Sequence, residues 1–257
     1  MSPRSDTVLS VDNVTVRFGG TLAVDGVSLT IRSHSAHALI GPNGAGKTTL
    51  LNGISRLVRI SGGPVVFGTC DLATVRADQL APMGLSRTFQ APILVEDMTV
   101  TENVALGLYA GYPTRLWEDL AGAARATRQA TRRVDLARQA TAELGLAPVA
   151  ERRVRELSFG TRKLVDLARA WASSPRFLML DEPTAGLNDP EVDRLAEFIA
   201  RVKTQTTILV VTHHLGFVMN IADHITVLDH GAKIAEGPPQ AVRHDPVVIA
   251  SYTGIGR

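Results

Sequence analysis

The chain has little or none of several features that mark particular protein classes. Its 257 residues include one cysteine, Cys70, which excludes an internal disulfide and a cysteine-based zinc site. No apolar run reaches the roughly 18 residues that a membrane-spanning helix needs, and the N-terminus lacks the apolar core of a secretory signal. Neither charge dominates, with 27 basic and 25 acidic residues, so the net charge of +2 does not by itself indicate a nucleic-acid partner.

The remaining composition is ordinary for a soluble globular protein. Hydrophobic residues make up 45% of the chain and charged residues 20%. A chain of this length can bury the core of one α/β domain with a smaller lobe. Any role at a membrane would then depend on a partner protein.

Residues 41–48 have the sequence GPNGAGKT and match the phosphate-loop pattern G-x-x-x-x-G-K-[ST] at every specified position. Its glycines lack a Cβ and tolerate φ > 0, so backbone N–H groups can surround a phosphate. These glycines are Gly41, Gly44 and Gly46. Lys47 is expected to reach the β and γ phosphates, and Thr48 to offer its hydroxyl to Mg²⁺. Residues 37–40 before the loop have the pattern of the end of a buried strand, and residues 48–54 after it that of a helix, which disfavours a chance Gly-rich turn.

A second motif combines a buried strand with two acids. Residues 177–180 are four apolar residues, and Asp181 and Glu182 follow directly, as expected where a parallel strand opens onto an active site. Successive side chains along a strand point in opposite directions, so the two acids can have different roles. We predict that Asp181 holds the Mg²⁺ bound by Thr48 and that Glu182 orients and deprotonates the attacking water.

Three further positions are ambiguous by pattern alone. Gln90 ends a predicted strand and is either an exposed loop glutamine or a contact to Mg²⁺ or water. Phe18 is either a core aromatic or a stacking surface for adenine. The strand predicted at 207–211 leads to His213 and His214, and a histidine there can contact a γ phosphate, but the pattern does not separate the two.

Ser158 and Gly160 precede a predicted amphipathic helix at residues 162–172. A serine and a glycine at a helix start can form an anion site, although an ordinary N-cap serine is the commoner use. A second short helix is predicted over 242–252 at the C-terminus.

Residues 99–157 are rich in Ala, Arg, Leu and Glu and predict helices rather than strands. Thr99 and Glu102 have the spacing of a capping box, and a long helix is expected within 117–144. Five arginines cluster along that helix, namely Arg125, Arg128, Arg132, Arg133 and Arg138. A solvated face is the first interpretation of this cluster, a partner-docking face the second and nucleic-acid binding the third.

Taken in order, these motifs resemble those of the ATPase subunit of an ABC transporter over essentially the whole chain. Residues 41–48 are similar to Walker A, 177–182 to Walker B, 157–161 to the signature motif, and 185–188 to the D-loop. Phe18, Gln90 and His213 match the A-loop aromatic, the Q-loop glutamine and the switch histidine.

The resemblance implies a fold of the α/β class. It is a P-loop, RecA-like mixed-sheet core with an N-terminal antiparallel β subdomain and an inserted α-helical subdomain. We expect one ABC ATPase domain over 7–257. Its core and β subdomain take residues 7–90 and 157–257, and the helical insertion takes 91–156.

The resemblance also implies the ligands and the site residues. ATP and Mg²⁺ are the expected cofactors. Catalysis is assigned to Glu182, His213 and Gln90, and metal binding to Thr48, Asp181 and Gln90. ATP binding is assigned to Phe18, Gly41, Asn43, Gly44, Gly46, Lys47, Thr48, Thr49, Ser158 and Gly160. Ser158 and Gly160 would serve the nucleotide of a facing subunit in a head-to-tail pair.

Within the family, the chain is most similar to the larger ATPase of branched-chain amino-acid importers. The sequence RTFQ at 87–90, TVTENV at 99–104 and the C-terminal residues 234–254 suggest this. Two departures stand out. The signature is LSFGT where the family commonly has LSGGQ, and Asn188 replaces the common D-loop aspartate.

The implied function is ATP hydrolysis that drives uptake of branched-chain amino acids or related small polar solutes. The implied partners are a second ATPase subunit (a paralogue or a copy of itself), two membrane permease subunits and an extracytoplasmic substrate-binding protein. No nucleic acid is expected. The chain would lie peripherally on the cytoplasmic face of the cell membrane. The alternatives are an exporter ATPase for lipid or polysaccharide and a non-transport ABC ATPase.

Overall fold

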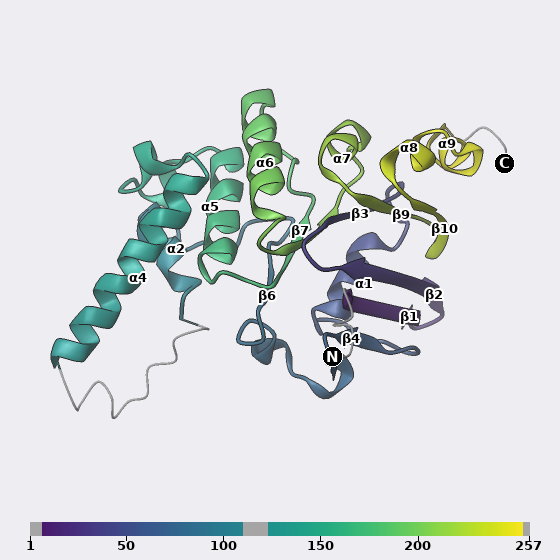
Figure 1. Ribbon diagram of the computed structural model, residues 1–257, viewed down its shortest axis with the longest axis horizontal. Coiled ribbons are helices and arrows are strands. Elements are labelled where there is room, and N and C mark those ends of the chain that lie inside the picture. The colour runs from purple at the N-terminus through teal and green to yellow at the C-terminus, as the bar shows by residue number, and fades with distance from the viewer. Residues whose placement is uncertain (1–6, 110–122, 254–257) are drawn as a thin grey trace, which may run out of the picture.

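The computed structural model describes residues 7–109 and 123–253, and side chains from 130 onward in the second range. None of the helices in these ranges has the length and apolar character needed to cross a membrane. The predicted α/β class is confirmed, with a mixed sheet, a separate antiparallel sheet and surrounding helices (Figure 1).

The central sheet carries the phosphate loop and both predicted polar strand ends. Its strand order is β10-β9-β3-β8-β7-β6. The strands are β3 (Ala36–Ile40), β6 (Leu85–Arg87), β7 (Phe177–Asp181), β8 (Thr207–Val211), β9 (His224–Asp229) and β10 (Ala232–Gly237). All neighbouring pairs are parallel except β9 with β10. The carboxyl ends of β3, β7 and β8 therefore meet at one edge, where ligands bind in open α/β sheets.

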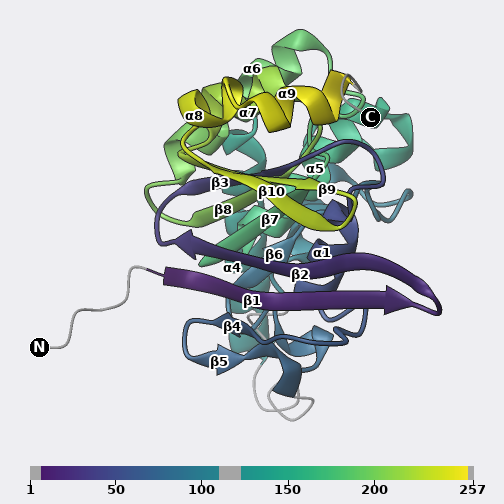
Figure 2. The same cartoon turned by 90° about the vertical axis from the view of Figure 1, so that its right-hand side faces the viewer.

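The N-terminal sheet is antiparallel, as predicted from the alternating residues before 31. It has the order β2-β1-β4-β5. Its strands are β1 (Thr7–Phe18), β2 (Thr21–Arg32), β4 (Val65–Phe67) and β5 (Cys70–Asp71). Helix α1 (Lys47–Ile54) lies between this sheet and the central sheet (Figure 2). Its buried residues Leu50, Leu51 and Ile54 share one apolar core with residues of both sheets, so the helix after the phosphate loop is fixed from two sides.

Helices cover the opposite side of the central sheet and one end of the molecule (Figure 1). The remaining α-helices are α2 (Val100–Leu106), α4 (Ala123–Glu143), α5 (Phe159–Ala172), α6 (Asp189–Val202), α7 (Leu215–Ile221), α8 (Pro239–Arg243) and α9 (Pro246–Thr253). Short 3₁₀ turns occur at Leu72–Thr74, Ala77–Gln79, Ala147–Val149 and Val154–Glu156. Residues of α2, α4, α5 and α6 share one core with alternate residues of β7 and β8.

Several local predictions are confirmed and others are corrected. Thr99 caps α2, and its hydroxyl accepts from the Glu102 amide in the predicted capping box. The single helix predicted over 242–252 is wrong. The chain forms α8 and α9 there because Pro246 starts a new helix instead of continuing the first. The helix predicted from 162 begins three residues earlier, at Phe159. Arg125 and Arg128 lie outside the residues whose side chains are described.

Candidate functional site

The phosphate loop joins β3 to α1 and depends on glycine at two crowded positions. Gly41 has φ 150°, and a Cβ there would lie 2.0 Å from the carbonyl oxygen of Leu228. Gly46 has φ 92°, and its Cβ would lie 2.4 Å from the carbonyl oxygen of Ala23. Side chains at these positions would push the loop off its supporting strands, so the loop shape follows from the sequence pattern.

The loop combines one buried lysine with several exposed residues. Lys47 is buried, and its Nζ donates to the carbonyl oxygens of Gly41 at 2.8 Å and Pro42 at 3.0 Å. Burial lowers the pKa of Lys47, while the negative charges of Glu182 and Asp181 oppose that change. Asn43, Gly44 and Thr48 are exposed, and Thr49 is half-buried. The loop thus presents open polar groups around a fixed positive charge, which suits a phosphate chain.

Asp181 ends β7 as a buried carboxylate with one free oxygen. Its Oδ2 accepts from the Arg87 guanidinium at 2.9 Å, and both side chains are almost fully buried. Its Oδ1 is buried and has no partner among the described residues. Burial raises the pKa of Asp181, and hydrogen bonds from Arg87 and Thr48 act against that rise. A buried carboxylate oxygen without a partner fits Mg²⁺, which prefers oxygen ligands.

Glu182 follows β7 and meets two residues from the end of β8. Its carboxylate accepts from the Thr212 hydroxyl at 3.0 Å. The Nδ1 of His213 lies 3.1 Å from each Glu182 oxygen. The backbone of Glu182 has φ 46°, a left-handed conformation that is unfavourable for a residue with a Cβ. The structure thus brings Glu182 and His213 together, whereas the ring of His214 stacks on Phe217.

Ser158 and Gly160 lie at the start of α5. The Ser158 hydroxyl accepts from the Thr161 amide at 3.2 Å and bonds the Thr161 hydroxyl at 2.8 Å, so Ser158 is an exposed N-cap. A Cβ at Gly160 would lie 2.8 Å from the carbonyl oxygen of Gly186, so only glycine allows this contact. The unusual Thr161 therefore belongs to the cap of the helix.

Two predicted residues stand apart from this cluster. Phe18 is 51% exposed at the end of β1, as a stacking surface would be. Gln90 is exposed in the segment that follows β6. Asn188, the second departure from the family pattern, caps α6 by accepting from the Glu191 amide at 2.9 Å.

Sequence reasoning missed three residues that contact the two acids. They are Arg87 at Asp181, Thr212 at the Glu182 carboxylate, and Lys163 at the Glu182 main chain. Thr212 had a usable signal, since it precedes His213 at a strand end. Arg87 and Lys163 lie far from the acids in sequence, and no local pattern links them to that edge of the sheet.

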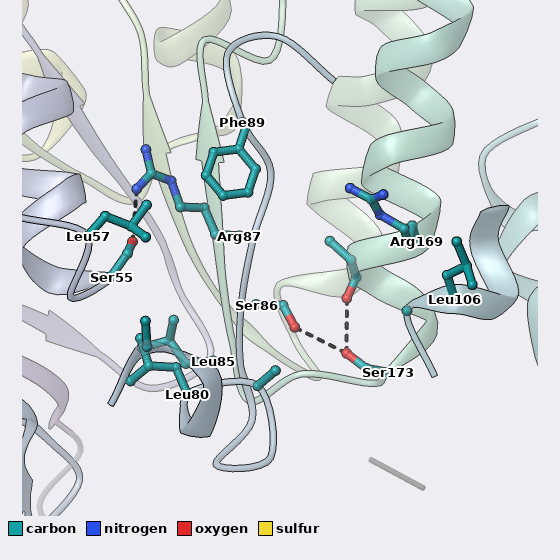
Figure 3. Close-up of a pocket in the computed structure, with 14 residues that line it drawn as sticks. Ser55, Leu57, Leu80, Leu85, Ser86, Arg87, Phe89, Leu106, Arg169 and Ser173 are labelled. Carbon is teal, nitrogen blue, oxygen red and sulfur yellow. Dashed lines mark hydrogen bonds between the residues drawn. The ribbon is translucent and has the colours of Figure 1, made fainter. Parts of the chain in front are cut away.

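An open groove of about 420 Å³ lies beside this site (Figure 3). Its lining includes Leu57 after α1, Arg87 and Phe89 around the end of β6, Leu106 of α2 and Arg169 of α5. The Arg87 side chain lies over the Phe89 ring, 5.0 Å from its centre. Arg87 thereby connects the groove to Asp181, and the groove separates the β core from helices α2 and α5.

The fold and the site together define a P-loop ATPase with an added antiparallel sheet and a helix-rich end. Comparisons with known proteins place it more narrowly. Residues 24–185 match the family model described as ABC transporter. Residues 232–256 match the model described as branched-chain amino acid ATP-binding cassette transporter.

The similar proteins match along the full chain. The chain is 37% identical to the high-affinity branched-chain amino acid transport ATP-binding protein LivG of Salmonella typhimurium, over 97% of this chain and 99% of that protein. It is 35% identical to BraF of Pseudomonas aeruginosa, a protein of the same description, with the same coverage. A solved nucleotide-free ATP-binding cassette from an ABC transporter shares 31% identity at a TM-score of 0.83, covering 98% of this chain and all of that one.

The chain belongs to the ATP-binding subunits of the ABC transporter family, and it is a transport ATPase. A solved cassette in its ADP conformation, with 31% identity, a TM-score of 0.82 and coverage of 96% of this chain and 99% of that one, shows that such cassettes bind nucleotide.

Proposed function

We propose that this chain is the ATP-hydrolysing subunit of an importer for branched-chain amino acids or related small polar solutes. The observation that carries this proposal is its full-length similarity to branched-chain amino acid transport ATP-binding proteins. The separate match of the C-terminal residues 232–256 to the branched-chain amino acid model supports the same subfamily.

The chemistry is hydrolysis of the γ phosphate of ATP. The phosphate loop residues and Thr49 bind the phosphates, and Phe18 stacks on the base. Glu182 orients a water and takes its proton, while His213 contacts the γ phosphate and Gln90 completes the site. Thr48, Asp181 and Gln90 would hold Mg²⁺, which would neutralise charge developing on the phosphates.

Two such chains face each other head to tail, each completing the other's site with Ser158 and Gly160. Ser158 is exposed at the N-terminus of α5, a helix end that favours anions. The γ phosphate then bridges two surfaces, and its loss lets them separate. The facing chain is a copy of this one or a paralogue.

The groove between the β core and helices α2 and α5 is the proposed docking site for a permease. Exposed apolar side chains rim it, with Leu57 at 53% exposure and Leu106 at 37%, as suits insertion of an apolar segment. Leu106 and Gly107 of the proposed helical subdomain, residues 91–156, line the groove, and this subdomain transmits the motion. Two permease subunits and an extracytoplasmic binding protein complete the transporter, and this chain lies on the cytoplasmic face of the membrane.

Isolation of the Glu182→Gln chain from its native membranes with ATP and Mg²⁺ tests this proposal. Mass spectrometry of the co-purified proteins should identify two hydrophobic permeases and an ATPase subunit. The wild-type chain, prepared with ADP, is the matched control and should retain less of the second ATPase. Recovery of soluble proteins or nucleic acid alone would contradict transport, and recovery of lipid-export components would contradict import.

A further inference from the structure

The mechanism above gives no role to Lys163, which is a buried charged residue. Lys163 lies one turn into α5 and is 7% exposed, although lysine is almost never fully buried without a partner. Its Nζ donates to the main-chain carbonyl oxygen of Glu182 at 2.6 Å. Burial lowers the pKa of Lys163, and the charges of Glu182, Asp181 and Asp166 oppose this. The ammonium group is thus aimed at the backbone of the residue assigned as the general base.

Glu182 is a residue that needs such support. Its left-handed backbone, with φ 46°, persists only where surrounding contacts hold it. Its amide donates to the carbonyl of Val211 at 2.7 Å, which fixes one side of the peptide chain. Lys163 and the Ala185 amide, at 3.2 Å, both donate to the Glu182 carbonyl, and Thr212 and His213 contact the carboxylate. Among these partners, Lys163 is the one that lies in a helix.

The same lysine belongs to the helix that begins at the signature motif. The Phe159 ring centre lies 5.7 Å from the Lys163 Nζ. Phe159 also covers Gly186, since a Cβ at Gly186 would lie 2.6 Å from that ring. Phe159, in the first turn of α5, therefore contacts both the Lys163 side chain and the segment after Glu182. A shift of this turn would disturb the Glu182 backbone.

We propose that Lys163 is a positioning residue that sets the Glu182 backbone and ties it to the helix start carrying Ser158. Because Ser158 serves the facing nucleotide in the head-to-tail pair, this step rests on the proposed function. The base of one ATP site is then linked, through one side chain, to the helix that senses the γ phosphate of the other site.

The test compares steady-state ATP hydrolysis and ATP affinity of the purified chain with those of Lys163→Met. Methionine keeps the length and packing of the side chain but cannot donate to the Glu182 carbonyl. We expect kcat to fall about tenfold to a hundredfold, since small misplacement of a reacting group has costs of that order. KM for ATP should change less than about twofold because the phosphate loop is untouched.

Matched variants separate positioning from a structural role. Lys203→Met removes a lysine paired with Asp223, at 2.7 Å, and should leave kcat unchanged. Lys163→Arg keeps a cationic donor and should recover most of the rate. In the Glu182→Gln chain, adding Lys163→Met should cause no further loss, because the group it positions is already removed.

An unchanged kcat in folded Lys163→Met would overturn the inference, as would an equal further loss in the Glu182→Gln chain. If Lys163→Met does not fold, the hydrolysis rate of Lys163→Arg tests the inference instead. A low kcat of Lys163→Arg with intact ATP binding would contradict the inference. Failure of Glu182→Gln to form an ATP-dependent pair would contradict the head-to-tail arrangement instead. The two failures are therefore distinguishable.

Discussion

At the scale of single residues, the site separates nucleotide binding from hydrolysis. Lys47 lies within the phosphate loop, whereas Glu182 lies across the site with Thr212 and His213. We expect Lys47→Ala to abolish ATP binding and Glu182→Gln to bind ATP with almost no turnover. Equilibrium binding of a fluorescent ATP analogue and phosphate release measure the two effects. Wild-type turnover in Glu182→Gln would remove Glu182 from the role of general base.

Gly160 gives a second prediction at this scale. The methyl group of Gly160→Ala would lie 2.7 Å from the Glu191 Oε2 and 2.8 Å from the Gly186 carbonyl oxygen. Overpacking of this kind costs about 1–3 kcal/mol, which urea denaturation should detect. Gly216→Ala is the control, because a Cβ there has no neighbour within 4 Å. Equal stability of both variants would show that the first turn of α5 can move away from the segment after Glu182.

Sequence patterns predicted the functional residues that lie together in one contiguous motif. The phosphate loop and the Asp181–Glu182 pair could be predicted because each is a contiguous motif with a fixed chemical purpose. The pattern alone did not separate His213 from His214, and only the family resemblance favoured His213, since the choice depends on which ring reaches Glu182 once β7 and β8 are adjacent. Arg87 and Lys163 were missed for the same reason, as parallel pairing and helix packing bring distant segments together.

At the scale of elements, two residues that depart from the family pattern take part in helix caps, Thr161 at the start of α5 and Asn188 at the start of α6. Asn188 caps α6 and forms a reciprocal capping box with Glu191. Asn188→Ala should therefore lower the free energy of unfolding by about 0.5–2 kcal/mol. Asn188→Asp keeps the acceptor oxygen and should stay near wild type. Chemical denaturation of the three proteins measures this, and equal stability of the alanine variant would show that the cap contributes nothing.

Element boundaries were predicted less well than element types. One helix was predicted over 242–252, but Pro246 begins a separate helix. Proline is well placed at the first turn of a helix, where its missing N–H has no intrahelical partner to lose. Pro246 is present in the sequence, so the boundary between the two helices was predictable from it.

At the scale of the whole molecule, stability should depend on pH through a buried histidine. His37 on β3 is 2% exposed, and its Nε2 lies 2.9 Å from the Thr226 hydroxyl. Burial, followed by the positive charge of His224, lowers the pKa of His37 from 6.5 to about 4. Between these values the unfolded chain takes up a proton that the folded chain does not. The contribution of His37 is therefore present above pH 6.5 and lost as the pH falls toward 4.

The expected size of this effect is about 2 kcal/mol between pH 7 and pH 5. Urea denaturation at both pH values gives the free energy of unfolding that the wild type and His37→Gln each lose between pH 7 and pH 5. The effect of His37 is the difference between these two losses. His244→Gln is the control, since His244 is exposed after α8. If wild type and His37→Gln lose equal stability on acidification, other groups cause the loss.

In the whole transporter, ATP hydrolysis by this chain is proposed to drive import of branched-chain amino acids. The most direct measurement is uptake of labelled leucine, isoleucine and valine by cells that lack the chain. We expect that uptake is lost, that the wild-type chain restores it, and that Glu182→Gln does not, although this variant is present at the membrane in equal amount. Unchanged uptake in cells without the chain, or full restoration by Glu182→Gln, would contradict this proposal.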